Sequence, residues 1–331
     1  MGTKGLFGLL KDSFKEWGED KASRLGAALA YYTIFSIGPL LVVVIAIAGF
    51  VFGEEAASGQ IVDTIGGVVG ESGATMIQEM VKSANKPGAG TIAGVIGLLT
   101  LLLGAAGLFG QLKDALNTIW GVQPKPGLGI MGMLRKNVLS FGMVVGTGFL
   151  LLASLVVNAA LAALADFLVD KLPGGPLLWQ IVNYAISLGV VTLLFALIFK
   201  VLPDVNIPWG IVWVGAAVTA FLFVVGQVAL GFYFGISDPG SAFGAAGSLV
   251  IILVWIYYSA QILFFGAEIT QVNSRLRGEP ITPSKDAEWI TGEARAQQGM
   301  RSDIKGSRAG KSRRDQPGEI KASPWFGWRS T

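Results

Sequence analysis

The chain has 331 residues, of which 52% are hydrophobic and 14% are charged, and its formal net charge is +3. The charges fall in separated segments while the apolar residues form long runs, which excludes an ordinary water-soluble globular protein and indicates an integral membrane protein. The chain contains neither cysteine nor histidine, which excludes disulfides and thiolate or imidazole metal sites.

Residues 1–24 are predicted to form a cytoplasmic helix that lies on the membrane. The sequence alternates apolar and charged side chains at helical spacing in this segment. The apolar face consists of Leu6, Leu10, Phe14 and Trp17, and the other face of Lys11, Asp12, Lys15 and Glu16. A helix with these two faces is typical of the membrane interface.

Six later windows lack Asp, Glu, Lys and Arg. Hydrocarbon offers backbone amides no partner, so a crossing segment of roughly 20 residues must be a helix. A transmembrane β-barrel would need alternating polar and apolar residues, and runs such as LLVVVIAIAGFVF do not alternate. We therefore predict an all-α integral membrane bundle within residues 25–272. Its six transmembrane helices are expected at about 27–52, 91–110, 138–164, 177–199, 209–234 and 247–267.

Two connections between these spans also show helical periodicity. The segment 54–90 is predicted to form one or two short amphipathic helices at the outer mouth of the bundle. After the second span, an apolar face lies opposite a polar one, which predicts a helix along the cytoplasmic surface. The apolar face is Phe109, Leu112, Leu116, Ile119 and Trp120, and the polar face is Lys113, Asp114 and Asn117.

Polar side chains within the spans are the candidate functional residues. In the first span Pro39 lacks an amide hydrogen, which predicts a kink. In the last span Tyr257, Gln261 and Glu268 are spaced to fall on one stripe of a helix. The complete candidate set is Tyr32, Ser36, Pro39, Asn183, Gln227, Tyr257, Gln261 and Glu268.

These polar residues have two interpretations. They could line a polar path across the membrane, with Glu268 gating its inner end. Alternatively, the neutral residues hold helices together, and Glu268 anchors the last helix at the cytoplasmic boundary, about 20 residues after Gly247. A charge costs about 2.5–3.5 kcal/mol at the middle of the membrane and less near the interface, so both interpretations stay open.

The tail from residue 273 to residue 331 is basic and lacks an apolar period, which predicts disorder. Of the 25 Lys and Arg residues, 22 fall on one side of the six-span arrangement, and only Lys82, Lys86 and Lys171 fall on the other. Positive loops stay cytoplasmic during insertion, so both termini are expected in the cytoplasm. Because insertion explains these charges, membrane lipids and not nucleic acid are the expected partners.

Four ordered segments resemble the YihY/BrkB family of bacterial inner-membrane proteins. They are ALAYYTIFSIGPLL, GLFGQLKDALNTIWGV, LPDVNIPW and SAFGAAGSLVIILVWIYYSAQILFFGAEITQV, and the likeness covers roughly residues 10 to 278. The resemblance implies a multi-pass protein of the plasma membrane with six spanning helices. It also implies a virulence or serum-resistance role for some members, and transport of a lipid-like or amphipathic solute.

The family was formerly labelled ribonuclease BN, but the residues argue against an enzyme. A magnesium site needs convergent carboxylates, whereas the inner side of the membrane domain offers only the scattered Asp114, Asp204 and Glu268. We expect no cofactor and no metal, and the pattern assigns no oligomeric state. The expected function is a transporter or flippase-like protein for a lipid or amphipathic solute. The alternative is a non-transporting membrane scaffold or envelope-integrity factor.

Overall fold

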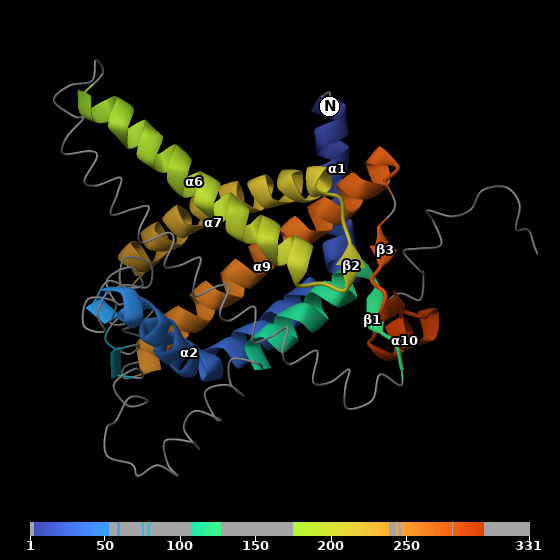
Figure 1. Ribbon diagram of the computed structural model, residues 1–331, viewed down its shortest axis with the longest axis horizontal. Coiled ribbons are helices and arrows are strands. Elements are labelled where there is room, and N and C mark those ends of the chain that lie inside the picture. Colours follow the sequence, from blue (N-terminus) through green and yellow to red (C-terminus); the bar gives the residue numbers. More distant parts are fainter. Residues whose placement is uncertain are drawn as a thin grey trace, which may run out of the picture.

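The computed structural model describes residues 3–52, 58–59, 75, 78–79, 107–126, 175–237, 243, 246–279 and 281–300. Four long helices dominate this part of the chain (Figure 1). They are α2 (Ala22–Phe52), α6 (Gly175–Val201), α7 (Trp209–Ser237) and α9 (Gly247–Arg277). Each contains one of the spans predicted from the sequence, and α9 continues ten residues beyond the predicted end of its span at residue 267.

The described helices confirm an all-α membrane protein. Three of them, α6, α7 and α9, are long and apolar enough to cross a membrane. The spans predicted at 91–110 and 138–164 and the outer segment 54–90 lie almost entirely outside the described residues. A bundle of six spans therefore stays a prediction.

The long helices expose apolar side chains in the way a lipid-facing surface requires. Only 17% of the window Tyr184–Val201 of α6 is buried, although it is almost wholly apolar. On α7, Phe221, Val228 and Phe232 are all more than half exposed. A water-soluble protein rarely exposes so large an apolar surface to water. Lipid acyl chains are the environment in which such a surface is stable.

Helices α7 and α9 approach closely through two reciprocal pairs of glycine and threonine. The side chain of Thr270 on α9 occupies the space that a Cβ on Gly215 of α7 would need, and Thr219 of α7 does the same at Gly266 of α9. Each threonine hydroxyl donates to a carbonyl of its own helix, at 2.7 Å in both cases. Small residues with internally bonded hydroxyls allow this packing without leaving a polar group unpaired in the membrane.

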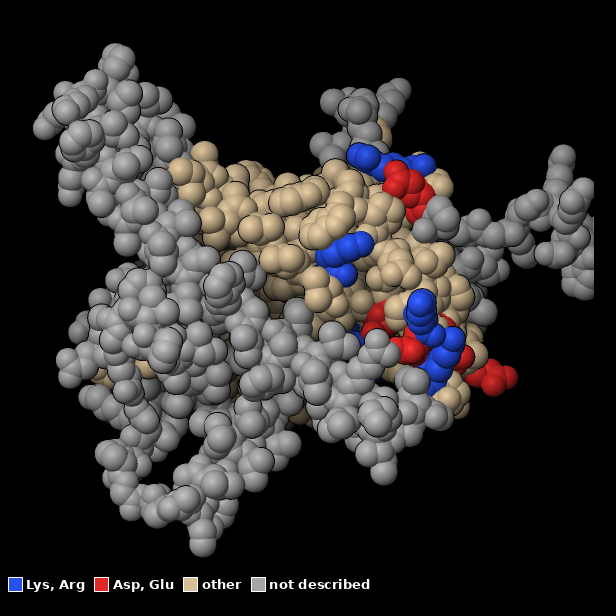
Figure 2. Space-filling view, in the orientation of Figure 1, with Lys and Arg blue, Asp and Glu red and all other residues tan. Residues whose placement is uncertain are grey.

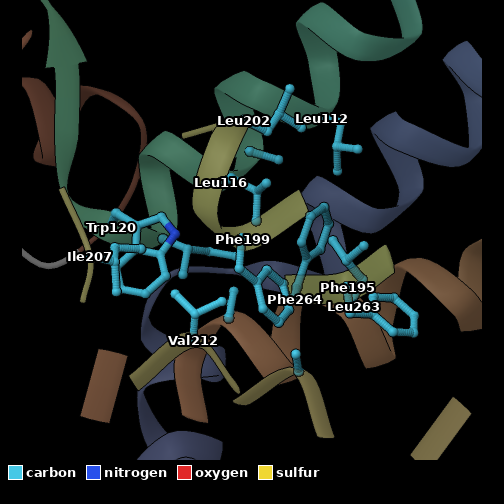
Figure 3. Packing of buried hydrophobic residues seen from close by; sticks show 14 of the residues in the cluster. Leu112, Leu116, Trp120, Phe195, Phe199, Leu202, Ile207, Val212, Leu263 and Phe264 are labelled. Atoms are coloured by element: carbon cyan, nitrogen blue, oxygen red, sulfur yellow. The ribbon is translucent and has the colours of Figure 1, made fainter. Parts of the chain in front are cut away.

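The main hydrophobic core lies where α6, α7 and α9 meet the helical residues 107–120. Trp120, Leu116 and Phe199 are almost completely buried there, together with Phe264 of α9 (Figure 3). The apolar face predicted for residues 107–120 is confirmed as a packing face. The segment is part of the core, however, because its polar residues Lys113 and Asn117 are buried as well.

Charged residues of the described chain gather at one end of the bundle, as Figure 2 shows. We call this region the charged end. It comprises α1 (Thr3–Glu19), the start of α2, residues 113–125, the connection 202–208, the end of α9 from Glu268, and residues 281–300. The opposite part of the described surface in Figure 2 shows no charged side chain, which is the charge distribution of a membrane protein with its polar end in water.

The C-terminal residues 281–300 are folded onto the charged end. The prediction of a disordered tail is therefore wrong for this part. Strand β4 (Ala287–Trp289) pairs antiparallel with β1 (Val122–Pro124), and β3 (Thr282–Pro283) pairs with β2 (Val205–Asn206). The short helix α10 (Gly292–Gln297) follows. Residues 301–331 lie outside the described residues.

Candidate functional site

The last turns of α9 form a polar segment that is buried on every side. Five polar residues between positions 268 and 274 are each no more than 5% exposed, and the Glu268 carboxylate is fully buried. They are Glu268, Thr270, Gln271, Asn273 and Ser274. We call this stretch the polar segment of α9. Burying so many polar groups is costly unless the surrounding elements supply partners.

Neighbouring elements enclose this segment with one hydrogen bond and close packing. The Gln271 side chain donates to the carbonyl oxygen of Ile119 at 3.0 Å, which ties α9 to the helical residues 107–120. Thr270 packs on Gly215 of α7. Leu9 of α1 packs against Ile269 and Val272, the apolar residues that alternate with the polar ones. The polar segment is therefore the point where three other helices meet α9.

A second polar cluster joins the helical residues 107–120 to the connection between α6 and α7. Lys113 Nζ lies 2.8 Å from Asp204 Oδ1, and Asn117 Nδ2 donates to Asp204 Oδ2 at 3.0 Å. The backbone amide of Asp204 donates in return to Asn117 Oδ1 at 2.8 Å. Asp204, one of the three carboxylates predicted to be scattered, is thus held by a lysine and an asparagine one helical turn apart.

Two ion pairs attach terminal segments to the same end. Arg275 of α9 lies 3.0 Å from Glu16 of α1. Arg295 of α10 lies 2.7 Å from Asp20, and both side chains are no more than 2% exposed. Removing one partner of such a pair leaves a buried charge, which costs about 3–5 kcal/mol. The contact between the C-terminal segment and the α1–α2 turn is therefore a fixed part of the fold.

The interface between α2 and α9 carries a different kind of polar group. A Cβ on Gly26 of α2 would lie 3.2 Å from the Gln261 Cδ and 3.6 Å from the Tyr257 ring, so both α9 side chains face α2. Both polar atoms of the Gln261 amide are buried and have no hydrogen-bond partner among the described residues. A buried amide without hydrogen bonds destabilises a membrane helix, whereas an apolar side chain would pack there without that cost. This amide is therefore the candidate functional feature within the span.

The structure brings only some of the predicted candidates together. Tyr257 and Gln261 share the α2 side of α9, and Glu268 continues the same stripe into the polar segment. Ser36 is buried on α2, and Tyr32 of α2 is 44% exposed and lies near Gly107. These five positions belong to the two packed helices α2 and α9.

The other three candidates lie apart from this interface or are not fully described. Gln227 is half-buried on α7, beside Gly226, against which the ring of Tyr258 packs. Helix α2 continues past Pro39 to Phe52. Asn183 belongs to α6, but the side chains of Pro39 and Asn183 lie outside the described residues. A polar path lined by all eight candidate residues therefore stays a prediction.

Several residues of the site were not selected from the sequence. Asp20 and Arg295 were missed because they are far apart in the chain, and Gln271, Asn273 and Ser274 because they follow the predicted span. A signal was present for the last three, since α9 stays helical while polar residues fall on all of its faces. Periodicity does not show whether such a segment is buried or exposed to water.

Three carboxylates at the charged end are engaged in ion pairs. Within the described ranges no group of three or more acidic residues is placed to hold a metal ion. Asp204, Glu16 and Asp20 each lie beside a lysine or arginine at 2.7–3.0 Å. These contacts use the carboxylates to join elements.

Long apolar helices with exposed apolar sides and one charged, folded end define an integral membrane protein. The chain belongs to the family described as Virulence factor BrkB, which it matches over residues 13–290. This is the YihY/BrkB family that the four sequence segments resemble. The match includes the polar segment of α9 and the strands β3 and β4.

The chain is also similar to bacterial proteins called UPF0761 membrane protein. The one from Alcanivorax borkumensis is 27% identical over 273 residues, which cover 81% of this chain and 60% of the relative. The one from Tolumonas auensis is 31% identical over 196 residues, covering 55% and 60%. The one from Pseudomonas aeruginosa is 27% identical over 252 residues, covering 75% and 58%. The chain spans about 60% of the length of these curated relatives. No solved structure matches it.

Proposed function

We propose that the protein moves a lipid or another amphipathic solute across the bacterial inner membrane, with the α2–α9 interface as part of the route. The observation that carries the proposal is the Gln261 amide, whose two polar atoms are buried without a partner among the described residues. Polar groups inside a membrane are costly and are typical of substrate pathways. An amide offers both a donor and an acceptor, which suits a hydroxyl, phosphate or amide headgroup.

The surroundings of Gln261 support an amphipathic substrate. Tyr257 on the same face is 37% exposed and Tyr32 on α2 is 44% exposed, so polar hydroxyls lie near the lateral surface of the two helices. Apolar side chains such as Ile252 and Ile256 fill the rest of the α2–α9 contact. A solute with a polar head and an apolar tail would find both kinds of surface there.

The proposal also accommodates Glu268 at the inner end of the route. Glu268 lies seven residues, or two helical turns, after Gln261 on the same side of α9. Glu268 is fully buried in the polar segment, and in the proposal this carboxylate meets a headgroup that leaves Gln261. In this role Glu268 selects against anionic headgroups or binds a cationic part of the solute.

Adjacent tyrosines provide a matched test. Tyr257 faces α2, whereas the ring and hydroxyl of Tyr258 pack on Gly226 of α7. Purified protein in unilamellar vesicles is assayed for the transfer of a fluorescent short-chain phospholipid, with dithionite quenching of the outer leaflet. We expect Tyr257→Phe and Gln261→Leu to slow transfer and Tyr258→Phe to leave it unchanged. Equal rates in the wild type and all three variants would contradict the proposal.

The second candidate function is a non-transporting scaffold or envelope-integrity factor that acts through its charged end. The folded segment 281–300 favours it, because this segment adds an ordered surface to the charged end. Removing residues 301–331 leaves every described contact intact, whereas truncation after Gly278 would also remove Arg295 from Asp20. A scaffold acting through residues 301–331 fails in the shorter deletion, and one acting through residues 281–300 fails only after truncation at Gly278. A transporter keeps its transfer rate in the shorter deletion.

A further inference from the structure

Helix α1 exposes apolar side chains and buries polar ones, which is the reverse of a helix that packs on a water-soluble protein. The residues that it buries against the bundle include Ser13 and Glu16 beside Leu9, whereas Phe7, Leu10 and Phe14 are 72%, 38% and 64% exposed. The predicted second face is therefore corrected at Glu16, which pairs with α9. The apolar side of α1 needs an apolar environment outside the described chain.

The charges around α1 indicate which environment that is. Lys11 and Lys15 are exposed and border the apolar face, and Lys15 has Glu19 4.0 Å away. With about 100° between successive residues, Asp12 and Glu19 fall on the side opposite Phe7, Leu10 and Phe14. An apolar stripe bordered by lysines, with acidic residues pointing away, is the pattern of a helix lying on an anionic lipid surface.

A second element reaches the same level of the bundle. At the start of α7, Trp209 and Trp213 are 45% and 43% exposed, and their rings lie 6.2 Å apart. Lys200 Nζ lies 5.7 Å from the Trp209 ring centroid. Exposed tryptophans beside a lysine are typical of the boundary between hydrocarbon and headgroups.

Contacts with α9 connect these two elements. Leu9 of α1 is buried with Ile269 and Val272 of α9, and Val218 of α7 packs against the same cluster. In the view of Figure 1, α1 runs across the direction of the long helices. A helix in this orientation lies in the plane of a membrane that the long helices cross.

We propose that α1 and the start of α7 together form a binding surface for anionic lipid headgroups of the leaflet at the charged end. Phe7, Leu10 and Phe14 enter the boundary between acyl chains and headgroups, and Lys11 and Lys15 bind the phosphates. Each lysine near an anionic surface strengthens association about fivefold. The proposal does not depend on transport, because it concerns only how the charged end is seated on the bilayer.

The chain contains no cysteine, so single thiols can test this surface on the full-length protein. Phe7→Cys, Phe14→Cys and the matched control Asp12→Cys each change an exposed residue of α1. Each variant is labelled with an environment-sensitive fluorophore and placed in nanodiscs that contain lipids spin-labelled near the headgroup. The nanodiscs are either zwitterionic or contain anionic phospholipid. Tryptophan fluorescence verifies that each variant is folded.

Strong quenching and a blue-shifted emission are expected at positions 7 and 14, with little change at position 12. Anionic lipid should increase the quenching at position 14, and Lys11→Gln with Lys15→Gln should abolish that increase. Quenching that is equal at the three positions, or absent at all of them, would overturn the membrane surface. Quenching that ignores both lipid charge and the lysine substitutions would overturn the headgroup assignment.

Discussion

Replacing Gly215 by alanine tests whether backbone proximity holds α7 and α9 together. The new Cβ would lie 2.8 Å from the Thr270 Cβ and 3.2 Å from the Gly266 carbonyl oxygen, and closer still to the Thr270 hydroxyl. Non-bonded carbons prefer about 3.5–4.0 Å, so the helices must separate. Overpacking of this kind costs about 1–3 kcal/mol, which exceeds the roughly 0.5–1 kcal/mol that alanine gains over glycine within a helix.

The control is Gly231→Ala on the same helix, where nothing lies within 4 Å of an added Cβ. Unfolding is followed by tryptophan fluorescence in mild detergent with increasing amounts of a denaturing detergent. The account predicts that Gly215→Ala lowers the free energy of unfolding by about 1–2 kcal/mol, while Gly231→Ala leaves it equal or slightly raised. Adding Thr270→Gly to Gly215→Ala should restore part of the loss. Identical stability of the two alanine variants would refute the packing argument.

Three further predictions concern the charged end. Arg295→Ala should lower the unfolding free energy by about 3–5 kcal/mol because it removes the arginine from the buried Asp20 carboxylate. Glu293→Ala on the exposed side of α10 should change it by less than about 0.5 kcal/mol, and thermal unfolding in detergent compares the two variants. Asp204→Ala should cost about 2–4 kcal/mol, since it leaves Lys113 buried without its carboxylate, and no loss of stability would contradict the cluster. Truncation after Met300 should leave the melting temperature unchanged, and a large drop would show that residues 301–331 contribute to the fold.

The membrane architecture could be predicted because it depends on composition over long windows. Stretches without charge fix where a helix can cross hydrocarbon, and α6 and α7 begin and end within a few residues of the spans expected at 177–199 and 209–234. The apolar face from Phe109 to Trp120 was predicted for a similar reason, since helical periodicity shows which side packs. Periodicity does not show which other element packs against such a face.

Long-range pairing explains most of what the sequence did not reveal. Strands β1 to β4 have two or three residues each, which is too short for an alternating pattern to stand out. Their pairing depends on loops that lie more than 75 residues apart in the chain. One local signal was present, because Thr291 accepts a hydrogen bond from the Ala294 amide as the N-cap of α10 and Glu293 lies in its first turn.

The role of the polar candidates depended on burial, which the sequence could not supply. Tyr257 and Gln261 were placed on one stripe correctly, but only the structure shows that this stripe faces Gly26 of α2. Adjacent Tyr258 faces α7 instead, although composition alone makes the two tyrosines equivalent. Glu268 was expected near the helix exit, and its complete burial follows from the segments that fold around it.

Water access to position 261 decides whether α2 and α9 line a polar route, because such a route must be hydrated where Gln261 lies. Gln261→Cys and the control Tyr258→Cys are introduced into the cysteine-free chain, and the proteins are treated in lipid nanodiscs with a small charged thiol reagent. The account predicts that the thiol at position 261 reacts and that the thiol at position 258 stays unmodified. A thiol at position 261 that is as inert as the control would show that Gln261 serves helix packing and lines no route.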